Sequence, residues 1–230
     1  MADKGPSGRS LKKKIIEILD SPDMDSALEE LRLLPVRKSV NQLFSLLYSS
    51  DQNMKWKAVR AMGVLVDMLA KEDEESARVI LRRLMWNLND ESGGIGWGSA
   101  EAMGEILANN DKLAGEYSAI LLSYAREDGN YQELESMQRG VLHGIGRLAQ
   151  VRPDLIKEGV PFILPFINTN DATLRGTAAW ILGLAGDVEA IDELESLLKD
   201  ESEIQIYAGG GLFGRRVKDI AKEAIEKILN

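Results

Sequence analysis

The chain has 230 residues, 44% of them hydrophobic, and a formal net charge of −9. It is long enough to bury a sizeable core, and its acidic balance argues against a surface that tracks nucleic-acid phosphates. It contains no cysteine, which excludes disulfides, thiolate zinc sites and cysteine nucleophiles. No apolar stretch reaches the roughly 18 residues that a membrane span needs, and no signal-peptide core follows the basic N-terminus. We therefore expect a cytoplasmic protein with no membrane anchor.

The chain is predicted to begin with a tail and a helical cap. Residues 1–8 are rich in glycine, proline, serine and charged residues, a composition typical of disorder. Apolar residues at spacings of three and four predict helices over 10–19 and 24–34, and Pro35 ends the second one. Because this pair lacks the ridge of alanine and glycine found in later helices, we interpret residues 9–35 as a cap over one end of a stack.

Five helical hairpins are predicted after the cap. The pattern is clearest over residues 171–200, where one amphipathic helix ends at Gly186 and Asp187 begins the next. Glycine ends helices because it adopts left-handed backbone conformations at little cost, and aspartate caps helix N-termini. Pro161 and Pro165 are expected to make the first helix of the fourth hairpin irregular. The predicted hairpins span residues 36–70, 74–109, 112–150, 153–185 and 187–230.

The second helix of each hairpin carries the same ridge of small and large apolar residues. Gly63, Gly104, Gly146 and Gly183 anchor this ridge in the first four hairpins, and Glu226 takes the equivalent position in the fifth. Successive anchors are 41, 42, 37 and 43 residues apart, a period typical of helical repeats of the HEAT and armadillo type. Since neither helix of a hairpin can bury its apolar face alone, the hairpins are expected to stack on one another.

The segment from Leu174 to Glu201 resembles the HEAT-like repeat first described in phycobilisome lyases. It reads LRGTAAWILGLAGDVEAIDELESLLKDE, and the family pattern runs roughly V-R-x-x-A-A-x-A-L-G-x-x-G-D-x-x-A-[IV]-x-x-L-x-x-L-L-x-D. The match is fair over residues 54–63 and 95–104 and weak before residue 36. The resemblance implies an all-α fold over residues 9–230, a right-handed α-solenoid of about five HEAT-like hairpins plus the cap. It implies contact with macromolecules but no particular partner.

Residues 203–216, EIQIYAGGGLFGRR, depart from the helical pattern. Apolar and polar residues alternate at Ile204, Gln205 and Ile206 before a run of three glycines, which is typical of a strand followed by a turn. We therefore predict a small β-hairpin insertion, followed by a closing helix over about 217–229.

A column of side chains is predicted to lie on the concave face of the solenoid, seven and three residues before each anchor. Three of the four tryptophans and the single histidine fall in this column. Tryptophan interleaved with arginine and glutamate is typical of a groove that binds peptides or proteins. The alternative is that the tryptophans bridge adjacent repeats and are half-buried there. The predicted partner-binding residues are Trp56, Arg60, Trp97, Glu101, Arg139, His143 and Trp180.

The turn SGGIGWG, residues 92–98, precedes a helix predicted to start near residue 95. Successive glycines can offer backbone N–H groups to an anion at a helix N-terminus. However, Asp90 and Glu91 place negative charge beside the turn, and the pattern is not a P-loop. We favour the alternative that the glycines permit a close approach of two helices, with Trp97 wedged between them.

The sequence predicts a non-catalytic protein-interaction or scaffold module, with no catalytic residue, metal or cofactor. His143 is the only histidine, so no HExxH pair exists. One alternative is a nucleic-acid-binding protein similar to the HEAT-like DNA glycosylases, although Glu101, Asp219 and Glu223 make the concave column too acidic for that role to be favoured. Another is an accessory subunit of a chromophore lyase, which only the resemblance suggests. The oligomeric state is left open.

Overall fold

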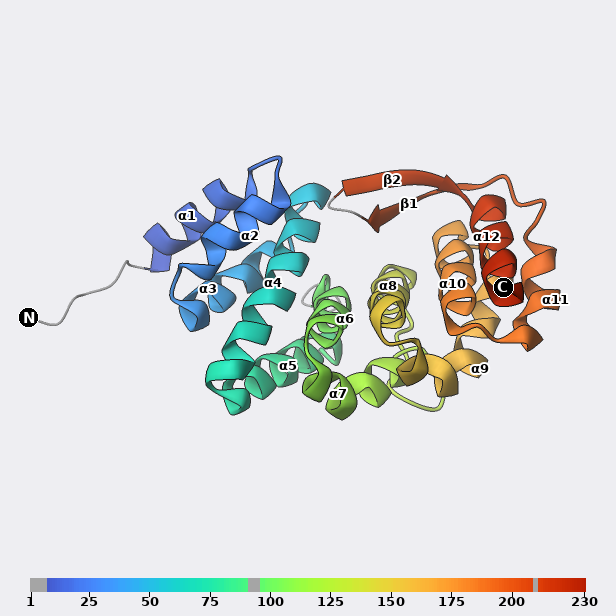
Figure 1. Cartoon of the computed structure of the whole chain (residues 1–230), viewed down its shortest axis with the longest axis horizontal. Helices are drawn as coiled ribbons and strands as arrows, with labels where there is room; N and C mark the ends of the chain where they lie inside the picture. Colours follow the sequence, from blue (N-terminus) through green and yellow to red (C-terminus); the bar gives the residue numbers. More distant parts are fainter. Residues whose placement is uncertain (1–7, 91–95, 209–210) are drawn as a thin grey trace, which may run out of the picture.

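The computed structural model describes residues 8–90, 96–208 and 211–230. It is an arched stack of helical pairs with one β-hairpin, the α-solenoid expected from the repeats (Figure 1). Most of the predicted tail, much of the glycine-rich turn and two of the three successive glycines lie outside the described residues. No helix within the described ranges is long and apolar enough to cross a membrane.

The first two helices form the N-terminal pair. Helix α1 (Gly8–Leu19) begins two residues earlier than expected, and α2 (Met24–Arg32) follows after a short turn. The Asp23 carboxylate caps α2 by accepting hydrogen bonds from the backbone N–H groups of Asp25 and Ser26. The apolar stripes of both helices are buried, which follows from their spacing of three and four residues.

Five further helical pairs follow within the described ranges. Their first helices are α3 (Val36–Leu43) with the 3-10 turn η1 (Phe44–Leu46), α5 (Glu74–Leu88), α7 (Asp111–Ser123), α9 (Val160–Ile163) between η2 (Pro153–Gly159) and η3 (Leu164–Asn168), and α11 (Ile191–Ser196) after η4 (Val188–Ala190). Their second helices are α4 (Gln52–Glu72), α6 (Ser99–Asn109), α8 (Glu135–Val151), α10 (Ala172–Ala185) and α12 (Val217–Leu229).

The ends and breaks of these helices follow local chemistry. Gly186 ends α10 in the left-handed conformation, with φ of 71°, and Asp187 caps the next turn by accepting the Glu189 N–H at 2.9 Å. In the fourth pair, the expected irregular helix is the succession η2, α9 and η3. Proline causes this break because it lacks the N–H that a continuous helix requires, and Pro161 and Pro165 lie within it.

The second helices lie side by side along the solenoid, in contact through the small-residue ridge (Figure 1). A Cβ atom at Gly104 of α6 would clash with the backbone carbonyl of Gly144 of α8. At Gly183 of α10 it would lie 2.6 Å from the Ala224 Cα atom of α12. Gly104 and Gly183 are therefore required by helices that approach to backbone contact.

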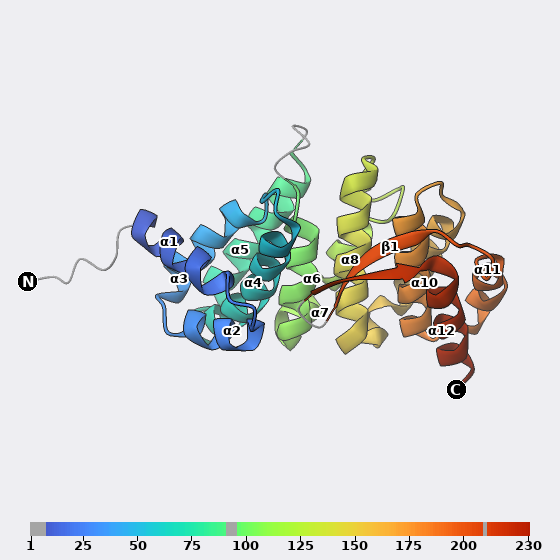
Figure 2. The ribbon, with the colours of Figure 1, turned by 90° about the horizontal axis from the view of Figure 1, so that it is seen from above.

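The β-hairpin predicted over residues 203–216 is present and crosses the concave side of the stack. Strands β1 (Glu203–Ala208) and β2 (Gly211–Arg216) are antiparallel, with Ile206 opposite Phe213 and Tyr207 opposite Leu212. The hairpin starts beside α10 and α12 and extends back toward α4, and seen from above it lies over α8 (Figures 1 and 2). It joins the C-terminal end of the solenoid to its N-terminal half.

Candidate functional site

A pocket of about 370 Å³ lies between the second helices and the β-hairpin. Its lining comes from α4, α6, α8 and α10, from Leu88 at the end of α5 and from the turn before α6, while Gln205, Ile206 and Leu212 of the hairpin enclose one side. Six of the seven residues that the sequence places on the concave face line this pocket. They are Trp56, Trp97, Glu101, Arg139, His143 and Trp180.

Four aromatic rings lie in series along the pocket. The Trp56 indole of α4 stacks on the Tyr207 phenol of the hairpin, with centroids 5.0 Å apart and planes 8° apart. The His143 imidazole lies 4.2 Å from Trp56 and 6.0 Å from Trp180, between the two indoles. Because Tyr207 covers it, Trp56 is only 9% exposed. The hairpin thus covers part of the column that the sequence places on the concave face.

Trp97 lies in the turn before α6 rather than on the helix, which starts at Ser99 and not near residue 95. Gly98 causes this difference, because its φ of 75° is left-handed and does not continue a helix. A Cβ atom at Gly98 would lie 2.8 Å from the Leu47 carbonyl oxygen, so a close approach exists, but it joins two turns at helix ends and not two helices. The interpretation of Trp97 as a wedge between helices is wrong, since its side chain is 50% exposed. The anion-binding alternative depends on residues 92–95, outside the described ranges.

A buried ion pair forms part of the pocket lining. The Lys55 ammonium of α4 lies 2.7 Å from Oε1 of Glu101 of α6, and the two side chains are 16% and 6% exposed. Burial by itself raises the pKa of the Glu101 carboxyl, but the charge and hydrogen bond of Lys55 outweigh it and hold the pKa below its ordinary value. The carboxylate fits against α8 because Gly140 has no side chain there. Both groups are therefore charged, and each neutralises the charge of the other.

His143 is neutral at pH 7. Burial lowers the pKa of its imidazole to about 4. The positive charges of Lys55 and Arg147 act in the same direction, and the Glu101 carboxylate, which favours the charged imidazole, does not offset them. Among the described residues, its ring nitrogens have no hydrogen-bond partner. A neutral imidazole has one N–H donor and one acceptor nitrogen. His143 lines the pocket, and both of its hydrogen-bonding functions are unused among the described residues.

We expect an NMR pH titration to give His143 a pKa of about 4 in the folded protein. In urea, the same signal should titrate near the ordinary value of about 6.5. Because the folded pKa is the lower one, the contribution of neutral His143 to stability is fully present above pH 6.5. About 3 kcal/mol of it is lost as pH falls from 6.5 to about 4. A folded-state pKa above 6 would contradict the buried environment given by Trp56, Trp180 and their neighbours.

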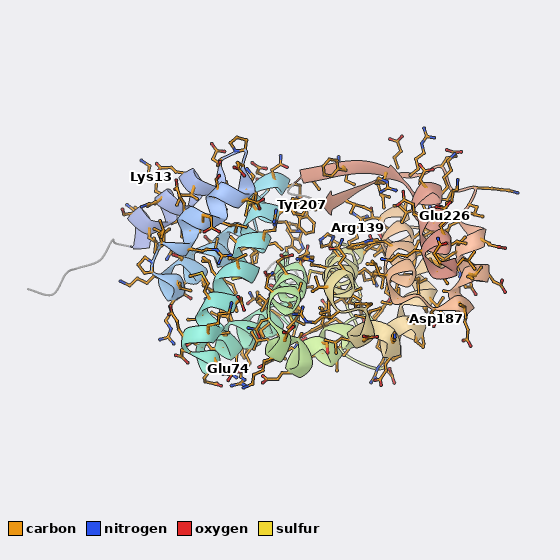
Figure 3. The ribbon with its side chains drawn as sticks, viewed as in Figure 1. Lys13, Glu74, Arg139, Asp187, Tyr207 and Glu226 are labelled. Atoms are coloured by element: carbon orange, nitrogen blue, oxygen red, sulfur yellow. The ribbon has the colours of Figure 1, made fainter. Side chains whose placement is uncertain are left out.

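The two arginines of the predicted column have different surroundings. Arg139 of α8 lines the pocket and is half-exposed, and its Nε donates to Oδ2 of Asp171, the N-cap of α10, at 2.9 Å. Arg60 of α4 does not line the pocket, and its Nη2 lies 3.5 Å from Oδ1 of Asp25 of α2. Figure 3 shows Tyr207 and Arg139 on the side of the solenoid that the hairpin crosses.

Sequence reasoning missed several residues of the pocket. Lys55 directly precedes Trp56 but falls outside the column of positions seven and three before the anchor. Thr177 of α10 is buried and lines the pocket, although its place in the repeat pattern indicates only packing. The hairpin residues Ile206 and Leu212 carry no signal of their location, because the sequence predicts the hairpin but not what it covers.

Comparison with known structures defines the class of protein. The structure is similar to the crystal structure of an engineered protein. The alignment covers 95% of this chain and 96% of the engineered chain, with a TM-score of 0.54 and 18% sequence identity. A designed armadillo repeat protein in complex with the peptide (KR)4 covers 95% of this chain and 99% of its own, with a TM-score of 0.53 and 15% identity. At such identities the likeness shows the fold alone, a solenoid of helical repeats.

Sequence comparison finds a family model that matches part of the chain. Residues 135–184, which include α8 and nearly all of α10, match the model of the HEAT-like repeat. An uncharacterized protein of Archaeoglobus fulgidus is 26% identical over 187 residues, which is 81% of this chain and 95% of the relative. The chain therefore carries a HEAT-like repeat over residues 135–184, within a fold that is a solenoid of helical repeats.

Proposed function

We propose that the protein is a non-catalytic interaction module that holds a segment of a protein partner in the concave pocket. The observation that carries this proposal is the convergence of Trp56, Trp97 and Trp180 from different repeats on one pocket. Aromatic residues around a concave site dominate the binding energy of many interfaces because they bury a large area with few rotatable bonds. A designed armadillo repeat protein of the same fold is in complex with a peptide, which supports this class of partner.

The nucleic-acid alternative has less support from the pocket and its surroundings. The two arginines on which it depends are occupied, since Arg60 lies near the Asp25 carboxylate and Arg139 pairs with Asp171. Binding of nucleic acid draws most of its affinity from unpaired basic groups that neutralise phosphates. A salt-dependent shift of a DNA or RNA probe would favour that alternative over a peptide partner. The cytoplasmic location stays a prediction, as does the absence of catalysis.

We expect Trp97→Ala to weaken peptide binding about tenfold or more, the effect typical of a contact residue worth roughly 1.4 kcal/mol or more. Peptides would first be selected from a random display library on the wild-type protein, and their affinities then measured by calorimetry. Trp97 is suited to this test because its side chain is half-exposed in a turn, so its removal should alter binding more than folding.

Trp86→Ala is the matched control. Trp86 lies on α5, is 74% exposed and does not line the pocket. This variant should bind the selected peptides with wild-type affinity, and circular dichroism should show the same helix content in both variants. Wild-type affinity in Trp97→Ala would contradict the proposed function.

A further inference from the structure

The charged groups that line the pocket are already paired within the protein. Lys55 pairs with Glu101, and Arg139 pairs with Asp171. His143, the remaining ionisable residue among the described residues of the lining, is neutral at pH 7. A charged group entering the pocket would lose its hydration without gaining an unpaired opposite charge, which is unfavourable. The described lining therefore favours an uncharged group.

The polar atom best placed to recognise such a group belongs to His143. Its ring lies between the indoles of Trp56 and Trp180, and its nitrogens have no partner among the described residues. A neutral imidazole both donates and accepts a hydrogen bond. A ligand that leaves this imidazole without a partner after water is excluded would bind poorly, because an unpaired buried polar group is costly.

The remaining walls favour a flat ring. Trp97 and Trp180 present indoles, and Met137 and Ile206 add apolar surface. The protein itself seats a phenol in this environment, since Tyr207 stacks on Trp56 in nearly parallel planes. The volume of about 370 Å³ lies at the lower end of the range for ligand sites, about 300–1,000 Å³. It has room for one large side chain and the backbone next to it.

We propose that the pocket binds a tyrosine or tryptophan side chain of the partner segment, with its ring against the indoles and its O–H or N–H hydrogen-bonded to His143. This inference rests on the proposed function and specifies the chemistry of its ligand. Phenylalanine satisfies the stacking but leaves the imidazole without a partner. Leucine satisfies neither requirement, and lysine brings a charge that the pocket does not neutralise.

His143 provides a direct readout, because it is the only histidine and its imidazole protons give unique NMR signals. The probes are the N-acetyl amides of tyrosine, tryptophan, phenylalanine, leucine and lysine, titrated into the full chain at pH 7. The tyrosine and tryptophan amides should shift the His143 signals in a saturable way, and phenylalanine should bind about tenfold more weakly. Leucine and lysine should produce no saturable shift. Equal binding of leucine or lysine, or no shift with tyrosine, would overturn the inference.

The variant His143→Leu separates recognition by the imidazole from stacking. Measured by calorimetry, its preference for the tyrosine amide over the phenylalanine amide should fall from about tenfold to about one, because neither ring then finds a hydrogen bond. Trp86→Ala should keep the wild-type preference. A preference that survives in a folded His143→Leu protein would overturn the role of His143.

The selected library peptides distinguish failure of this inference from failure of the proposed function. Peptides that need Trp97 but lack a shared tyrosine or tryptophan would overturn the inference and leave the proposed function standing. Peptides that bind Trp97→Ala and the wild type equally would overturn the proposed function itself. Peptides that need Trp97 and share one tyrosine or tryptophan, whose change to phenylalanine costs about tenfold in affinity, would support both.

Discussion

Gly104→Ala is expected to lower the free energy of unfolding by about 3 kcal/mol, at the upper end of the usual cost of overpacking. The added methyl group would clash with the backbone carbonyl of Gly144, so α6 and α8 must move apart. Alanine favours helix by about 1 kcal/mol over glycine, and this gain is included in the net figure. For a chain of this size the loss corresponds to a decrease in Tm of about 6–12 °C, measurable by circular dichroism.

Gly115→Ala is the matched control for this substitution. Gly115 lies inside α7, is exposed, and has no atom within 4 Å of the position where a Cβ would be built. Here only the helix preference acts, so the variant should be about 0.5–1 kcal/mol more stable than the wild type. If Gly104→Ala also stabilised the protein, the close contact of α6 and α8 would be wrong.

Lys55→Met is expected to cost about 3–5 kcal/mol at pH 7, because it leaves the buried Glu101 carboxylate without a counter-charge. The double variant Lys55→Met, Glu101→Met should recover much of this loss, since no unpaired charge then remains. Urea denaturation of the wild type, Lys55→Met, Glu101→Met and the double variant gives the interaction energy of the pair. If Lys55→Met were as stable as the double variant, the energetic coupling of Lys55 and Glu101 would be contradicted.

Lys55→Met should also reverse the way in which the contribution of Glu101 to folding stability depends on pH. In the wild type the pKa of Glu101 is lowered, so its contribution is present above the ordinary carboxyl pKa of 4.5 and lost as pH falls through the lower, folded pKa. In Lys55→Met burial acts alone and raises that pKa, so protonation stabilises the fold. The stability difference between variant and wild type should therefore shrink between pH 7 and pH 5. A difference that does not change over this interval would contradict a buried carboxylate.

Local chemistry explains why much of the fold is predictable from the sequence. Apolar spacing predicts the helical pairs, Gly186 and Asp187 predict a turn between two of them, and Pro161 and Pro165 predict an irregular helix. Each of these signals acts within a few residues of the chain. The β-hairpin at 203–216 is predictable for the same reason, because alternation and turn glycines are also local.

The candidate site was predictable only in part. The repeat register brings Trp97, Glu101, Arg139, His143 and Trp180 to one pocket, because equivalent positions of stacked repeats lie next to each other. Their electrostatics needed the structure. The neutral state of His143 and the ionised state of Glu101 both depend on burial, and burial depends on which elements cover the pocket.

The sequence by itself determined the repeat, the helical pairs, the small-residue ridge and the presence of a β-hairpin, since each has a periodic or local signature. Only the tertiary structure decided that this hairpin crosses the concave side and places Tyr207 on Trp56. Those two residues are about 150 positions apart in the chain, and no local preference relates them. Their contact arises because the stacked helices bring α4 within reach of a strand that begins beside α10, where apolar surface on both sides is removed from water.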